Sequence, residues 1–284
     1  MNEVIVRRPV LGRVRARKDW LYQVCLGLAG LIAVTALLAP WLAPQDPNAV
    51  DLGAALADPS GAHLLGGDGS GRDVLSRLIT GSRTALLGPL GVVVFSTVLG
   101  VTVGVTAAWR GGWVDTMLSR GTELIFAFPG LLLAILVIAL FGPGLAAPIV
   151  ALSIAYLPFV SRMARGLALA ERERPYLAAY RVQGFSGWTI CLRHLVPNIA
   201  PAILAQATVS FGYALLDLAA LSYLGLGVQP PTPDWGAMIS EGQAAVLQGQ
   251  PLPAIVPGTA IVLTVVAFNV VGERLADRVA RRDR

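Results

Sequence analysis

Long apolar runs limit the possible folds of this sequence more than any other feature. Six such runs alternate with polar segments, and each is close to the roughly 20 helical residues that cross the apolar core of a bilayer. Lipid offers no hydrogen-bond partners, so a single run can cross it only as a helix. The sequence therefore predicts an all-α polytopic membrane protein with six transmembrane helices. The runs are residues 20–42, 85–109, 124–141, 145–163, 199–221 and 252–271.

The basic residues indicate which side of the membrane each polar segment faces. Of the 22 lysine and arginine residues, all but three fall in segments on the side of the two termini. The exceptions, Arg72, Arg77 and Arg83, follow the first apolar run. Cytoplasmic segments of membrane proteins carry an excess of lysine and arginine. We therefore expect six spans with both termini in the cytoplasm.

The order of apolar and polar segments divides the chain into three parts. Residues 1–82 are predicted to hold a basic cytoplasmic arm, the first transmembrane helix and an outer loop with a short interfacial helix. The first run is longer than the apolar region of a usual signal peptide, which favours an uncleaved anchor. Residues 83–273 would form five helices with the cytoplasmic loop 161–197, and residues 274–284 a basic cytoplasmic tail.

The outer loop 43–83 is rich in proline, glycine and aspartate. Its segment 63–77 contains Asp68, Arg72 and Asp73 in a glycine-rich stretch. This stretch lacks the Gly-Lys-Ser/Thr ending of a phosphate loop, and its acids do not fall at calcium-loop positions. A short interfacial helix is predicted from four apolar residues on one helical face, namely Val74, Leu75, Leu78 and Ile79.

The loop 161–197 is the one large polar interruption in the second half of the chain. Pro175 suits the first turn of a short helix, and Gly184 can end that helix. A second short helix can begin at Ser186 and lead to the next apolar run at Pro197. Two tyrosines beside a small residue fit a partner's groove, although a helix lying on the membrane would show the same spacing. The face in question consists of Tyr176, Ala179, Tyr180 and Gln183.

The rarest residues exclude several kinds of chemistry. Lys18 is the only lysine, so the chain cannot supply the lysine of a Walker A loop, and any ATP hydrolysis must come from another subunit. His63 and His194 are expected on opposite sides of the membrane, so we expect no metal site. Two cysteines, Cys25 and Cys191, do not form a disulfide framework, and we expect no disulfide between them. No catalytic arrangement is evident. The net charge of +5 lies at the ends of apolar spans, which indicates topology rather than nucleic-acid binding.

The cytoplasmic loop resembles the coupling loop of binding-protein-dependent ABC importer permeases. In that family a glycine follows an EAA triplet after three residues, and a hydrophobic-proline ending follows ten residues later. Gly184 matches the glycine and residues 194–197 match the ending, whereas the triplet is Ala178-Ala179-Tyr180 and lacks its acid. The resemblance implies an ATPase-coupling site that consists of Tyr176, Ala178, Ala179, Tyr180, Gln183, Gly184 and Pro197.

Further stretches resemble this family over roughly residues 20–279, and one of them indicates its dipeptide, oligopeptide and nickel branch. Residues 63–77 are similar to a loop of that branch. Glu123 stands where the family usually has an aspartate, in a region that includes Ala127-Phe128-Pro129. The remaining similar stretches are residues 221–227, 230–236 and 267–272.

This resemblance implies a type I ABC importer permease fold in a bacterial cytoplasmic (inner) membrane. The expected function is half of a translocation path for peptides or a related small solute. The expected partners are a second homologous permease, two ATP-binding cassette subunits that use ATP and Mg²⁺, and an extracytoplasmic solute-binding protein; the chain itself would bind no cofactor and no nucleic acid. A nickel or metal-chelate cargo is the alternative. An ion-coupled secondary transporter would need more intramembrane acids than Glu123 and Asp217.

Asp217 lies about twenty residues beyond Pro197, in the outer part of the fifth run. A carboxylate at that depth cannot face lipid cheaply. It is therefore expected either to make a structural contact between helices or, with Glu123, to line the translocation path. The residues alone leave both roles open.

The predicted topology can be tested by cysteine labelling in a background that lacks Cys25 and Cys191. Ser60→Cys and Gln243→Cys should react with an impermeant reagent added outside sealed cells, whereas Ser186→Cys should not. Labelling of Ser186→Cys from outside would contradict the six-span arrangement.

Overall fold

The computed structural model describes the backbone of residues 11–282 and the side chains of residues 20–278. Within this range the protein is built from helices and has no strand, as predicted. The basic arm and the end of the basic tail lie outside the described side chains. The α-helices are α1 (Leu11–Leu42), α2 (Val74–Arg110), α3 (Gly112–Phe126), α4 (Gly130–Phe141), α5 (Ala146–Arg172), α6 (Pro175–Val182), α7 (Gly187–Ile190), α8 (Val196–Tyr223), α9 (Trp235–Leu247) and α10 (Leu252–Arg282).

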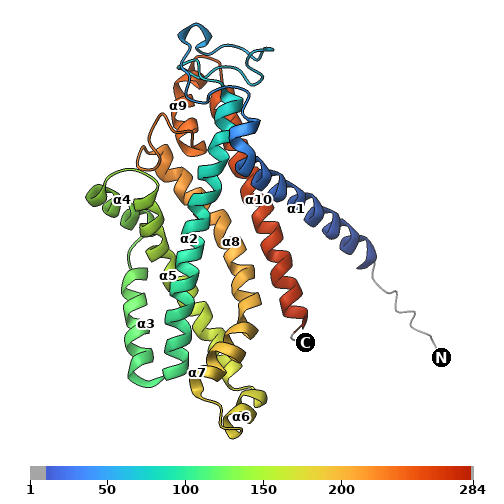
Figure 1. The fold of residues 1–284 in the computed structure, drawn as a ribbon, viewed down its shortest axis with the longest axis vertical. Coiled ribbons are helices and arrows are strands. Elements are labelled where there is room, and N and C mark those ends of the chain that lie inside the picture. The colour runs from blue at the N-terminus through green and yellow to red at the C-terminus, as the bar shows by residue number, and fades with distance from the viewer. Residues whose placement is uncertain (1–10, 283–284) are drawn as a thin grey trace, which may run out of the picture.

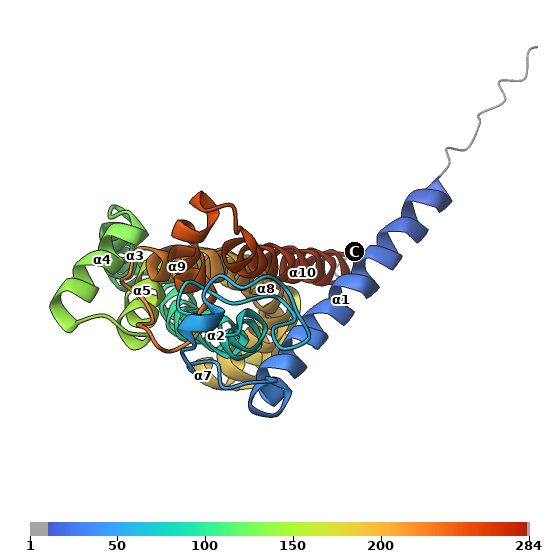
Figure 2. The same cartoon turned by 90° about the horizontal axis from the view of Figure 1, so that it is seen from above.

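The long helices run between two ends of the molecule (Figure 1). Helix α9 and the loop between α1 and α2 lie at one end, and α6 and α7 lie at the other. The first turn of α1 and the last turn of α10 point towards the end that carries α6 and α7. Seen from above, α1 leaves the bundle at an angle, and α4 lies on the opposite side (Figure 2).

Among the residues that the structure describes, five segments are long and apolar enough to cross a membrane, and the number rises to six if α3 and α4 form one broken span. The third span was expected as one helix over residues 124–141, but the chain bends by 82° between α3 and α4. Pro129 explains the break, because it lacks an N–H and disfavours a helical conformation at Phe128. Helix α3 also begins earlier than expected, directly after Gly111, whose φ is +65°.

The short interfacial helix predicted before the second span is not a separate element. Its residues form the first turns of α2, which continues for 37 residues. Asp73 caps this helix by accepting a hydrogen bond from the Ser76 amide at 2.7 Å. No proline follows until Pro89, so nothing in the sequence ends the helix between Ile79 and the apolar run. The predicted boundary between residues 82 and 83 therefore falls inside α2.

Helix α2 forms the centre of the bundle through close contact with α5. Gly100 and Gly104 face Val160 and Ser161, and a Cβ atom at Gly104 would meet the Ser161 carbonyl. Small residues allow such close approach between membrane helices, where apolar burial gives little driving force. A buried cluster from α2, α4, α5 and α8 continues this packing towards the outer end. Arg165 of α5 also binds Asp115 of α3 through two of its guanidinium nitrogens, at 2.6 and 2.7 Å.

Replacing Gly104 tests this contact. Gly104→Ala should force α2 and α5 apart and lower the free energy of unfolding by about 1–3 kcal/mol, although alanine is the better helix former. Gly166→Ala, on α5 itself, is the matched control, because nothing lies within 4 Å of its new Cβ atom. Thermal unfolding of both variants in detergent measures the difference. Equal stability of the two variants would show that the glycine contact is not needed.

Candidate functional sites: coupling loop, cavity and outer network

The coupling loop has the two short helices and the glycine corner expected from its sequence. Pro175 occupies the first turn of α6, and Gly184 follows this helix with φ of +84°, a left-handed conformation. Ser186 then caps α7 by accepting a hydrogen bond from the Thr189 amide. One π-helical turn, Cys191–Leu195, joins α7 to α8. The loop is thus continuous with a membrane-spanning helix.

The two tyrosines of α6 hold the loop together from within. The Tyr176 hydroxyl donates to Glu171 at 2.6 Å and accepts from the Asn198 amide at 2.6 Å. Burial, followed by the bond to Glu171, raises the pKa of Tyr176 to about 12, so the hydroxyl stays protonated and can donate. The Tyr180 ring stacks on His194 with 3.9 Å between centroids. These contacts connect α6 to the end of α5 and the start of α8.

The exposed surface of the coupling loop differs from the face expected for a partner. Tyr176 and Tyr180 are half-buried, whereas the other proposed coupling residues, Ala178, Ala179, Gln183, Gly184 and Pro197, are exposed. Three apolar side chains missing from the sequence-based site are also exposed, and they lie on or beside the glycine corner. They are Val182, which is 89% exposed, Phe185 and Trp188. Their position on either side of Gly184, in a polar loop, was the available signal.

The coupling loop is tied to the inner end of α2. Arg172 donates to the Ala108 carbonyl at 2.8 Å, one of the carbonyl groups in the last turn of α2. Arg181 lies over the Trp109 ring at 5.5 Å, and Arg110 lies over the Trp188 ring at 5.6 Å. These contacts fasten the middle of the loop, between Arg172 and Trp188, to a helix that crosses the whole bundle.

A cavity of about 500 Å³ lies where α5, α8 and the break between α3 and α4 meet. From α8 it is lined by Gln206, Ser210, Tyr213 and Asp217, which follow one another at four, three and four residues. This spacing puts four polar side chains on one face of the helix. The Tyr156 hydroxyl of α5 donates to the Asp217 carboxylate at 2.9 Å. The other lining residues are Pro129, Gly130, Leu131, Ala155 and Phe159.

Only one of the two acids expected along a path lies at this cavity. Asp217 lines it, whereas Glu123 is absent from its lining and has a side chain that is 56% exposed on α3, 3.9 Å from Arg120. The sequence-based reasoning missed Gln206, Ser210 and Tyr213. Their helical spacing from Asp217 could have revealed them.

The outer residues singled out from the sequence form an ionic network with α9. Arg72 binds Asp68 at 2.7 Å and also Glu241 of α9 at 2.7 Å. Arg77, only 1% exposed, binds the same Glu241 oxygen at 2.8 Å. Asp73 instead caps α2. The sequence-based site lacked Arg77 and Glu241, because their pairing joins residues 164 positions apart.

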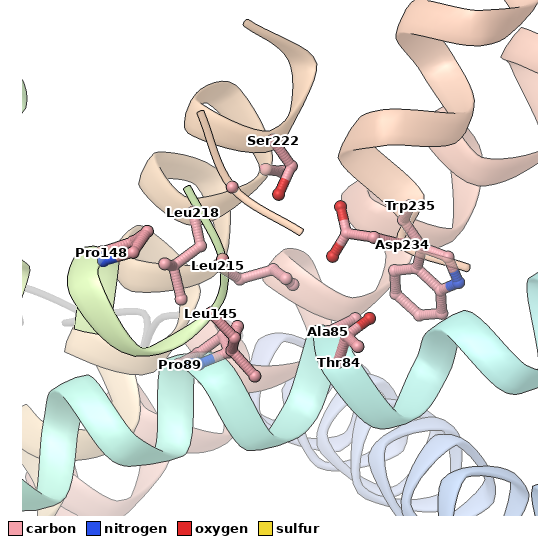
Figure 3. Close-up of a pocket in the computed structure, with 13 residues that line it drawn as sticks. Thr84, Ala85, Pro89, Leu145, Pro148, Leu215, Leu218, Ser222, Asp234 and Trp235 are labelled. Atoms are coloured by element: carbon pink, nitrogen blue, oxygen red, sulfur yellow. The ribbon is translucent and has the colours of Figure 1, made fainter. Parts of the chain in front are cut away.

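Helix α9 is seated on the outer ends of α2 and α8 (Figure 3). Asp234 caps it by accepting from the amides of Gly236 and Ala237 at 3.0 and 3.1 Å, and burial raises the pKa of Asp234. Trp235 donates to the Leu78 carbonyl of α2 at 2.9 Å. The space beside them is only about 10 Å³, enough for a single water molecule rather than a solute. Among the described residues, no group of three or more histidine, cysteine or acidic side chains could hold a metal ion.

The hydroxyl of Tyr176 can be tested apart from its ring. Tyr176→Phe removes both hydrogen bonds of that hydroxyl and leaves Glu171 and Asn198 with fewer partners, so the loop should lose about 1–3 kcal/mol of stability. Limited proteolysis of the loop should then become faster. Tyr180→Phe is the matched control, because its contact is made by the ring. Similar proteolysis rates for both variants would contradict the role of the Tyr176 hydroxyl.

Comparison with known proteins identifies the family. The model of the family described as "Binding-protein-dependent transport system inner membrane component" matches residues 100–284. A second model, described as "N-terminal TM domain of oligopeptide transport permease C", matches residues 13–59. Together they cover most of the chain, including the coupling loop, the cavity residues of α8 and most of α1.

Several curated proteins match nearly the whole chain. The glutathione transport system permease protein GsiD of Pectobacterium atrosepticum is 39% identical, with 89% of this chain and 85% of the relative covered. The dipeptide transport system permease protein DppC of Alkalihalophilus pseudofirmus is 35% identical, with 89% and 84% covered. The probable D,D-dipeptide transport system permease protein DdpC of Escherichia coli K12 is 38% identical, with 87% and 83% covered.

A solved structure shares the fold. The MetNI methionine ABC transporter, in inward-facing conformations, has a chain that superposes with a TM-score of 0.56. The match covers 71% of this chain and 95% of that chain, at 20% sequence identity. The predicted resemblance is thus confirmed. The chain belongs to the family of inner membrane components of binding-protein-dependent transport systems, and it is a permease subunit of an ABC importer, with ATP hydrolysis carried out by a separate subunit.

Proposed function

We propose that this permease carries peptides or a closely related small solute delivered by an extracytoplasmic binding protein. The observation that carries this proposal is similarity at 35–39% identity to relatives named for glutathione, dipeptide and D,D-dipeptide transport. These named solutes all contain amide bonds and charged groups. The polar face of α8 at the cavity offers hydrogen-bonding groups to such a solute.

The complete importer would contain a second homologous permease and two ATP-binding cassette subunits that use ATP and Mg²⁺. A second permease is supported by the exposed side chains at the rim of the cavity, since Phe159 and Tyr213 are about half exposed in this chain alone. A partner packed against α3–α5 and α8 would close the cavity into a path between two chains. This chain binds neither ATP nor a metal ion in this proposal.

The coupling loop would be the contact with an ATPase subunit. Val182, Phe185 and Trp188 supply an exposed apolar surface around the glycine corner, of the kind that fits a groove on a partner. Movement of that corner would reach α5 and α8 through Tyr176, and α2 through Arg172. Closing and opening of the ATPases could then drive alternating access.

Ligand identification and uptake test the proposed substrate. The binding protein that stimulates the assembled importer should be purified and its carried ligand identified by mass spectrometry. Peptide uptake into proteoliposomes should require this binding protein and ATP. Uptake of nickel or a metal chelate, with none of peptide, would replace the proposed substrate by the alternative.

The glycine corner allows a test of coupling. Gly184 has φ of +84°, which a β-branched residue adopts only at a cost of about 1 kcal/mol or more. Gly184→Val should therefore leave membrane insertion intact and lower uptake per ATP hydrolysed several-fold. Gly184→Asn is the control, because asparagine tolerates this conformation and should retain most coupling. A wild-type ratio of uptake to hydrolysis in Gly184→Val would refute the proposed role.

A further inference from the structure

We propose that the cavity beside α8 binds the ammonium group of the solute during its passage, with Asp217 as the counter-charge. This inference rests on the proposed peptide substrate and adds a binding site within the membrane to it. The site consists of Asp217 and Tyr156 at its centre, with a polar stripe that continues along α8 as Tyr213, Ser210 and Gln206.

The first step concerns the charge of the site. None of the side chains that line the cavity is lysine, arginine or histidine, so Asp217 has no cationic partner among them. A carboxylate inside a membrane span is costly unless a cation or hydrogen-bond donors compensate it. Within the described part of the chain, Tyr156 is its one hydrogen-bond donor, at 2.9 Å to Oδ2. The second carboxylate oxygen remains for a donor from outside the chain.

The second step separates a charged ligand from a structural contact. A hydrogen bond from Tyr156 alone would be accepted equally well by the neutral amide of an asparagine. A carboxylate is the better choice where positive charge arrives, because a paired charge crosses an apolar region at a lower cost than a lone one. The rings of Phe159 and Tyr213 also line the cavity and can stabilise a cation through their faces.

The third step concerns size. Gln206 and Asp217 are eleven residues apart on one helix face, which corresponds to about 16 Å along the axis. An extended chain of three to four residues spans about 10–14 Å. A short peptide with its amino group at Asp217 could therefore place its amide groups beside Tyr213 and Ser210, which lie about 6 and 10 Å away along the axis. The cavity of about 500 Å³ also falls in the usual range for small-ligand sites.

The test compares uptake of three peptides of equal length by the assembled importer in proteoliposomes. The first has a free amino terminus and a lysine side chain, the second has a free amino terminus and neutral side chains, and the third has neutral side chains and an acetylated amino terminus, so that it carries no ammonium group. For each peptide, the rate is divided by the amount bound to the binding protein, so that delivery does not enter the result. Asp217→Asn should reduce uptake of the two peptides that carry an ammonium group about tenfold and leave uptake of the N-acetylated peptide nearly unchanged. Asp217→Glu should restore a large part of the loss, because it restores the charge.

Controls distinguish this site from a structural role. Thr208→Val lies on α8 but outside the cavity lining, conserves volume, and should leave all three rates unchanged. Asp217→Asn could instead lower assembly or thermal stability of the importer, whichever peptide is present, and leave uptake per assembled complex unchanged. The carboxylate would then be a contact with the partner permease, and the inference would be overturned. Equal loss for all three peptides also overturns it. If the wild-type complex takes up no peptide, the proposed substrate is refuted, and the assigned ligand with it. If the wild-type complex takes up peptides and the Asp217→Asn variant does so at the same rates, only the proposed site is refuted.

Discussion

The close contact between α2 and α5 is the interaction on which the other parts of the bundle depend. Apolar side chains gain little by leaving lipid for one another, so membrane helices associate through close backbone approach and polar contacts. Gly100 and Gly104 provide that approach against Val160 and Ser161. Once α5 is placed on α2, the cluster shared with α4 and α8 forms around the pair, and α8 is held so that its polar stripe faces the cavity.

Helix α2 also connects the two functional ends of the molecule. Its 37 residues correspond to about 55 Å, enough to extend through the bilayer and beyond. At the inner end Arg172 binds its Ala108 carbonyl, and at the outer end Arg77 binds Glu241 while Trp235 donates to the Leu78 carbonyl. A displacement of α2 as a rigid body therefore moves the coupling loop and α9 together. Pro89, the one proline within α2, lies in the outer half of the helix. A bend of α2 would occur most easily there, and it would let the outer end change direction relative to the inner end.

Local features of the structure could be predicted from the sequence, and contacts between distant segments could not. The spans follow from hydropathy, and Gly184 takes the left-handed conformation expected of a glycine after a helix. The position of Pro129 was visible, but the 82° bend depends on how α4 packs against α5. The bonds of Tyr176 and the pairing of Arg77 with Glu241 depend on tertiary packing, for which spacing gives no signal. The polar face of α8 at Asp217 is an intermediate case. The helical spacing of its residues could be recognised in the sequence, whereas the cavity that they line could not.

The composition of the cavity suggests how a permease can share selectivity with its binding protein. A binding protein that releases its solute at the outer end has already chosen it, so tight binding within the path would only slow release. One carboxylate, paired with Tyr156 and placed beside aromatic rings, can lower the cost of moving an ammonium group out of water without holding it by many bonds. A hydrogen-bonding stripe along α8 can do the same for peptide groups at each position in turn. Such a path favours a chemical class of solute over any individual member of that class.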